Sequence, residues 1–111
     1  MTRVKSEVLV SAALRHANTV LIDCVLARRG DADAGAILVH IDALDGRHKL
    51  LARSLNLGGE YEWQIITNTE WVDSEAASTR LAAEMKMDQD AFIIAVCDSQ
   101  ARNPFDTLRL I

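Results

Sequence analysis

The chain has 111 residues, of which half are hydrophobic and a quarter are charged. This length and balance predict one globular domain spanning residues 1–111, and they argue against a disordered chain. The formal net charge of −4 disfavours nucleic-acid binding, which needs a basic surface, and no apolar run reaches the ~18–20 residues of a membrane-spanning helix. We therefore expect no nucleic-acid partner and no membrane association.

The first residues and the cysteines predict a cytoplasmic protein. Charged residues interrupt the start of the chain, so the long apolar segment of a secretory signal is not expected there. Cys24 and Cys97 each lie within an apolar, strand-like pattern, where a free thiol behaves as a small hydrophobic group. We expect both thiols to be reduced and structural, because a disulfide needs an oxidising compartment.

A helix followed by two strands is predicted for the first part of the chain. Apolar residues recur at helical spacing over residues 7–18, and Ser6 is the expected N-cap. Residues 20–27 are almost wholly apolar and rich in β-branched side chains, which predicts a strand buried on both faces. A loop over residues 30–35 then leads to a second strand at residues 36–43.

Asp45 and Gly46 predict a tight hairpin after the second strand. This pair is preferred at the centre of a two-residue type I′ turn, because both positions need a positive φ. The resulting register places Asp42 opposite Lys49 across the two strands, which is a favourable pairing of opposite charges.

Metal and catalytic chemistry are both disfavoured by the predicted register and the motifs. The register points His40 and His48 to opposite faces of the sheet, so they are not expected to share a metal ion. The sequence has no Cys-x-x-Cys pair, no nucleophile elbow and no phosphate-binding glycine pattern. We expect no catalytic residue, no metal site and no cofactor.

The rest of the chain adds a strand, a helix, a last strand and a tail. Residues 60–67 alternate charged and apolar side chains, as in a strand with one solvated face. Asp73 or Ser74 is the expected cap of a second helix. Residues 92–97 are continuously apolar, which predicts a central strand, and residues 99–111 form a tail that docks on the domain or on a partner.

The element order α-β-β-β-β-α-β predicts an α+β domain. Consecutive hairpins give antiparallel pairs, and the helix before the last strand allows one parallel pair. We therefore expect a single mixed, mainly antiparallel sheet of about five strands, with both helices against one face. Leu21, Val25 and Leu38 would then lie uncovered on the other face, where an apolar patch marks an interface.

Residues 28–35, here called the 28–35 loop, are the candidate site. Arg28, Arg29, Asp31 and Asp33 fall within six positions, and together with backbone amides they can bind a small anionic ligand. The alternative is structural. In that case the aspartates form Asx turns, the glycines supply unusual φ angles, and the arginines pair within the domain.

The run Arg-Arg-Gly-Asp-Ala-Asp-Ala-Gly-Ala-Ile over residues 28–37 resembles the hallmark of a bacterial family, the domain of unknown function numbered 1491. The resemblance extends from residues 5–8 to the strand around Phe92. That family has no assigned activity, so the resemblance bears on fold and bacterial context and implies no chemistry.

Two functions follow as hypotheses. The first is a small non-catalytic protein that acts through protein–protein contact, as a homodimer, through uncovered apolar residues. Tyr61, Trp63 and Trp71 would belong to the core or would add an exposed aromatic surface for a partner. The second is binding of a small anionic ligand at the 28–35 loop, with an enzyme as an extension of that case.

Overall fold

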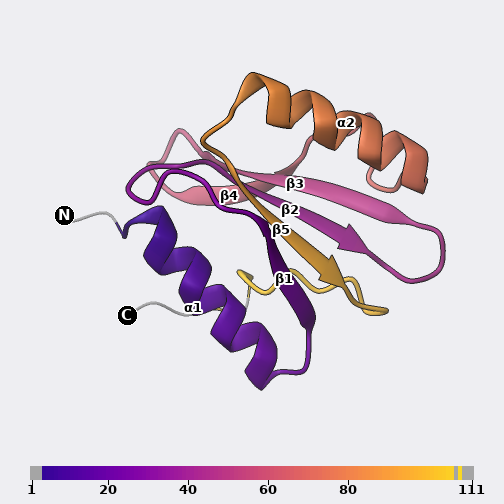
Figure 1. The fold of residues 1–111 in the computed structure, drawn as a ribbon, viewed down its shortest axis with the longest axis horizontal. Helices are drawn as coiled ribbons and strands as arrows, with labels where there is room; N and C mark the ends of the chain where they lie inside the picture. The colour runs from indigo at the N-terminus through magenta and orange to yellow at the C-terminus, as the bar shows by residue number, and fades with distance from the viewer. Residues whose placement is uncertain (1–3, 107, 109–111) are drawn as a thin grey trace.

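A computed structural model describes residues 4–106 and 108, and it confirms the predicted class and order of elements. In this part of the chain, two helices and one five-stranded mixed sheet form an α+β domain (Figure 1). The elements are α1 Ser6–Thr19, β1 Asp23–Arg28, β2 Ile37–Asp42, β3 His48–Leu55, β4 Tyr61–Ile65, α2 Ser74–Met87 and β5 Phe92–Cys97. Residues 107 and 109–111 of the predicted tail lie outside the described residues.

The strands follow the order β1-β5-β2-β3-β4 across the sheet. Every neighbouring pair is antiparallel except β2 and β5, which run parallel. These two strands are central and mostly buried, as the continuous apolar pattern of β5 predicts. Their parallel pairing is possible because α2 carries the chain from the β4 edge back to the middle of the sheet (Figure 1).

The two helices lie on opposite faces of the sheet, so the prediction that both cover one face is wrong (Figure 1). α1 packs over a core that includes Val39 and Ile94. α2 covers Leu38 and Ile93 on the other face. Because β2 and β5 carry apolar side chains on both faces, each face needs a cover that excludes water. Leu38 is consequently only 7% exposed, and it does not contribute to an open apolar patch.

β1 is an edge strand, in contrast to the predicted strand buried on both faces. It pairs with β5 alone, and its side chains alternate between exposed and half-buried. Part of the apolar pattern precedes the strand: Leu21 has a φ of 61° and is 85% exposed, and the Ile22 N–H donates to the Ala17 carbonyl at 2.8 Å. Within β1, Val25 is 56% exposed. The predicted exposure of Leu21 and Val25 is therefore confirmed.

The β2–β3 hairpin forms, but its register differs by one residue from the prediction. A longer loop replaces the two-residue turn, with positive φ values of 65° at Leu44 and 89° at Gly46. Asp42 Oδ1 accepts a hydrogen bond from the Leu44 N–H at 2.8 Å, which stabilises the longer loop. Asp42 therefore lies opposite His48, and not opposite Lys49.

The two cysteines are free, as predicted, but they differ in exposure. Cys24 in β1 packs partly against the core, and burial raises the pKa of its thiol to about 11. Cys97 is exposed at the end of β5, so the structural role expected of both thiols applies to Cys24 alone.

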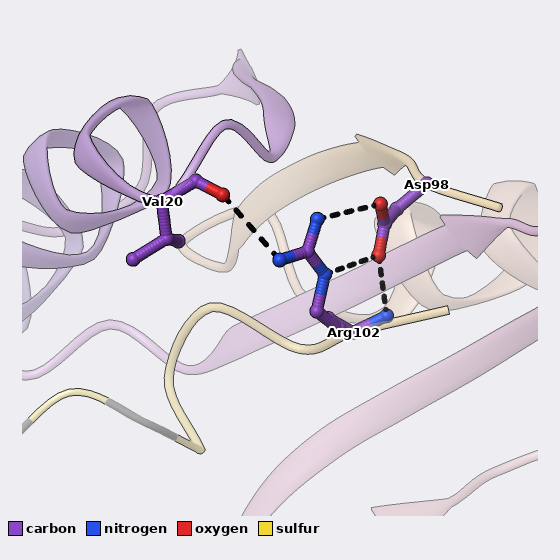
Figure 2. A network of polar contacts seen from close by, with 3 residues as sticks. All are labelled: Val20, Asp98 and Arg102. Atoms are coloured by element: carbon purple, nitrogen blue, oxygen red, sulfur yellow. Dashed lines mark hydrogen bonds and ion pairs between the residues drawn. The ribbon is translucent and has the colours of Figure 1, made fainter. Parts of the chain in front are cut away.

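The described part of the tail folds back over the domain. Arg102 donates from Nε and Nη2 to the two carboxylate oxygens of Asp98 at 2.9 and 3.0 Å, and from Nη1 to the Val20 carbonyl at 3.4 Å (Figure 2). These hydrogen bonds hold the pKa of Asp98 below its usual range. Further along, the buried Phe105 ring lies 4.9 Å from the Trp63 ring, measured between centroids. The tail therefore adds to the core on the α1 face, and Trp63 belongs to that core.

Candidate functional site

The 28–35 loop provides the surface against which α1 begins. The N–H groups of Ser6 and Glu7 donate to the carbonyls of Asp33 and Ala32 at 3.3 and 2.9 Å. These bonds satisfy two of the amides that a helix leaves free at its N-terminus. The Ser6 hydroxyl donates to the Gly35 carbonyl at 2.7 Å, so this side chain anchors the loop and is not the predicted N-cap.

Arg28 connects the same region to the end of α2 and the start of β5. Its guanidinium donates to the main-chain carbonyls of Ala91, Met85 and Asp88 at 3.1, 3.4 and 2.6 Å. The C-terminal carbonyls of a helix lack partners within the helix and carry partial negative charge, which favours a cation. Arg28 therefore stabilises the end of α2.

Arg29 and Asp33 form separate ion pairs with the start of α1. Arg29 Nη1 lies 2.6 Å from Glu7 Oε1, and Asp33 Oδ1 lies 3.4 Å from Lys5 Nζ. Both pairs are exposed to solvent, where such contacts contribute little to stability. The arginines and aspartates of the 28–35 loop thus have different partners around the domain.

Asp31 and the glycines hold the backbone of the loop. Asp31 Oδ2 accepts a hydrogen bond from the Ala34 N–H at 2.9 Å, and the Asp31 N–H donates to the Asp90 carbonyl at 2.8 Å. Gly30 and Gly35 do not have the positive φ expected of them; instead, a Cβ at either position would overlap the Asp90 carbonyl. These contacts favour the structural alternative, and the ligand role of the loop stays a prediction.

The observed register brings four titratable side chains into one row across the sheet, here called the transverse row. Cys97 of β5 pairs with Asp23 of β1 on one side and with Asp42 of β2 on the other, and Asp42 pairs with His48 of β3. Directly paired residues point to the same face, so the row lies on the α2 face. Asp23 and Cys97, at the β1 end, are exposed, whereas His48 is buried.

A pair of histidines lies at the β3 end of the transverse row. His40 Nε2 is 3.0 Å from His48 Nδ1, so the prediction that the two rings point to opposite faces is wrong. The physical reason is the hairpin register, because a shift of one residue moves a side chain to the other face of a sheet. Among residues 4–106 and 108, no three His, Cys, Asp or Glu side chains are placed to hold a metal ion.

Burial and neighbouring charges shift the pKa of two groups here, Cys97 in the transverse row and His40 beside it. Burial lowers the pKa of His40, the adjacent His48 lowers it further, and Asp42 partly opposes both effects. Although Cys97 is exposed, partial desolvation by neighbouring atoms raises the pKa of its thiol, and the carboxylates of Asp42 and Asp23 add to this effect. A protonated thiol is a weak nucleophile, so the arrangement does not activate Cys97 for covalent catalysis.

The histidine pair is expected to make folding stability depend on pH. The pKa of His40 lies below its ordinary value of 6.5, so its contribution to stability is complete above that pH and is lost as the pH falls. We expect the free energy of unfolding in urea to fall between about pH 7.5 and pH 5, and to fall less in His40→Gln. If the free energy of unfolding depends on pH equally in His40→Gln and in the parent, this assignment to His40 is contradicted.

The comparisons with known proteins identify a family. A family model described as "Protein of unknown function (DUF1491)" matches residues 4–106. The chain belongs to this family. The resemblance noted at residues 28–37 is thereby confirmed, and the DUF1491 match contains both the 28–35 loop and the transverse row. No curated protein matches the chain.

Solved structures support the fold of this DUF1491 protein. A crystal structure of a DUF1491 family protein from Caulobacter crescentus CB15 has a TM-score of 0.83 at 24% identity, covering 98% of this chain and 100% of that chain. An NMR structure of a DUF1491 family protein from the same organism has a TM-score of 0.80 at 23% identity, covering 94% of each chain. A solution structure of a protein from A. tumefaciens has a TM-score of 0.71 at 24% identity, covering 86% of each chain. At these identities the similarity bears on fold alone.

The DUF1491 match brings no chemistry to either site. In the described part of the protein, neither helix combines the length and the apolar character needed to cross a membrane.

Sequence patterns singled out the 28–35 loop but missed the transverse row. The available signal was a titratable residue at one end of each of four strands, namely Asp23, Asp42, His48 and Cys97.

Proposed function

We propose that this protein acts in the cytoplasm through protein–protein contact, as a homodimer joined along β1. The observation that carries the proposal is the exposed β1 edge, which lies beside the exposed side chains of Leu21 and Val25. An edge strand presents a row of unpaired backbone N–H and C=O groups, which a second strand can satisfy. The exposed apolar side chains at that edge would gain free energy if a partner protein covered them. Both cysteines are free, which agrees with a reducing compartment.

The charges at the two ends of β1 favour a second copy of the same chain. Asp23 begins the strand and has no ion pair among the described residues, whereas Arg28 and Arg29 follow at the other end. Antiparallel pairing of two β1 strands brings Asp23 of each copy near the arginine end of the other. Parallel pairing would bring like charges together. The antiparallel arrangement also has the twofold symmetry of most homodimers.

The opposite edge of the sheet is less suited to self-association. β4 carries Glu62, and Glu60 directly precedes the strand. β4 has no lysine or arginine, so two antiparallel β4 strands would offer no cation to these carboxylates, whereas the two ends of β1 carry opposite charges. The charge pattern therefore selects β1 over β4 as the dimer edge.

Replacing Val25 by lysine tests the proposed dimer. The parent should have twice the chain mass of 12.2 kDa by light scattering after size exclusion, and Val25→Lys should have the monomer mass. Edge lysines block strand pairing, and Val25 is already largely exposed, so folding stability should change by no more than about 0.5 kcal/mol. Leu57→Lys, which changes an exposed leucine of the β3–β4 loop, should remain dimeric. A monomeric parent at high protein concentration would contradict the proposal.

A further inference from the structure

We propose that Arg53 is the centre of a binding site for an organic carboxylate, on the α1 face of the sheet near β4. This inference is independent of the proposed dimer, because β3 and β4 lie at the opposite side of the sheet from β1. It depends on three observations. They are the contact of the Arg53 guanidinium with an aromatic ring, the lack of an anionic partner among the described residues, and the apolar side chains beside it.

The Arg53 guanidinium lies over an aromatic ring. Its Cζ atom is 4.1 Å from the centroid of the Tyr61 ring, which is the geometry of a cation–π contact. A cation–π contact does not use the N–H groups of the guanidinium, which stay available to an acceptor. A planar carboxylate accepts two parallel hydrogen bonds from such a fork.

Arg53 has no anionic partner among residues 4–106 and 108. Other cations near β3 are neutralised: Arg47 pairs with Asp45 at 2.8 Å, and Lys49 pairs with Glu70 at 3.2 Å. Arg53 is half-buried, and burial lowers its pKa. A partly desolvated guanidinium without a counter-charge gains free energy when an anion binds, because the anion restores both charge balance and hydrogen bonds.

The side chains around Arg53 select an anion with an apolar body. The strand register places Trp63 directly opposite Arg53, and Leu55 opposite Tyr61. Leu55 and Tyr61 are 48% and 47% exposed, so they offer apolar surface beside the charge. Successive side chains of a strand point to opposite faces of the sheet, so Glu62 of β4 lies on the face opposite Arg53 and does not repel an anion bound there.

A single cation in this setting favours a carboxylate over inorganic phosphate. Phosphate at neutral pH carries between one and two negative charges and is strongly hydrated, so one guanidinium beside apolar side chains compensates it poorly. A carboxylate carries one charge, and an attached ring or alkyl group can cover Tyr61 and Leu55. The expected ligand class is therefore an aromatic or branched aliphatic monocarboxylate.

Nuclear magnetic resonance with benzoate as the probe tests the site. The ¹⁵N-labelled protein is titrated with sodium benzoate at constant ionic strength, while the arginine Nε–H signals are followed. We expect a saturable shift of the Arg53 signal and of amides in β3 and β4. Arg53→Gln should abolish the saturable response, and Tyr61→Leu should weaken affinity by roughly threefold through loss of the ring. Arg15→Gln, at an exposed arginine of α1, is the matched control and should bind as the parent does.

Two outcomes would overturn the inference. One is a benzoate response that is not saturable in the parent or that persists unchanged in Arg53→Gln. The other is equal binding of inorganic phosphate and benzoate, which would contradict the organic carboxylate class. If Arg53→Gln does not fold, the Tyr61→Leu titration still tests the site, because unchanged affinity for benzoate in that variant would contradict a site built on the contact between Arg53 and Tyr61. A monomeric parent protein would refute the dimer and leave this result intact.

Discussion

Replacing Gly30 by alanine is expected to lower the free energy of unfolding by about 3 kcal/mol. A Cβ at this position would overlap the Asp90 carbonyl and lie 2.6 Å from the Phe92 nitrogen. Both neighbours are main-chain atoms at the entry to β5, so no side-chain rotation relieves the overlap. The 28–35 loop would have to separate from the central strand. Urea unfolding at fixed pH, followed by circular dichroism, measures the loss.

Gly58→Ala is the matched control for this substitution. Gly58 lies in the β3–β4 loop, and its nearest neighbour to an added Cβ is the Asn56 side-chain oxygen at 3.4 Å. We expect the free energy of unfolding to change by no more than about 0.5 kcal/mol. Similar losses in Gly30→Ala and Gly58→Ala would contradict the close approach of the 28–35 loop to β5.

Replacing Arg28 by alanine is expected to cost about 2 kcal/mol of unfolding free energy. The substitution removes the donor to three main-chain carbonyls, two of them in or directly after the last turn of α2. These partly buried carbonyls would lose a charged hydrogen-bond partner, and the end of α2 should fray. Hydrogen exchange of the α2 amides, measured alongside urea unfolding, reports that fraying directly.

The neighbouring Arg29 provides a control within the same motif. Its ion pair with Glu7 is exposed, with side-chain exposures of 66% and 48%. Arg29→Ala should therefore cost less than about 1 kcal/mol. If Arg28→Ala is as stable as the parent, Arg28 does not stabilise the end of α2. A metabolite-induced rise in Tm that both arginine variants lose would then support the ligand hypothesis for the 28–35 loop.

Local patterns were enough to predict the elements and their order. The second helix illustrates this, because Asp73 Oδ1 accepts the Ala76 N–H at 2.8 Å, as an N-cap residue does. β5 is likewise central, as its continuous apolar sequence predicts. Such signals arise from residues within one or two turns of each other, so a single segment contains the information.

The register of the β2–β3 hairpin is harder to predict from sequence than the elements themselves, because turns of different length compete at the same residues. Asp45 and Gly46 favour a two-residue turn, but the hydrogen bond from the Leu44 N–H to Asp42 stabilises a longer loop. The difference of one residue reverses the relation between His40 and His48, which contact each other instead of pointing to opposite faces. The conformation of the β2–β3 loop thus decided whether His40 and His48 lie on the same face of the sheet.

The sequence by itself determined the class, the order of elements and the importance of the 28–35 loop, because these depend on periodicity, composition and a short motif. Only the tertiary structure decided that the helices cover opposite faces, that β1 is an edge, and that Arg28 contacts the end of α2. The transverse row also belongs to the tertiary structure, since Asp23 and Cys97 are brought together by the pairing of β1 with β5. Such long-range pairing minimises exposed apolar surface over the whole domain, a quantity that no single segment encodes.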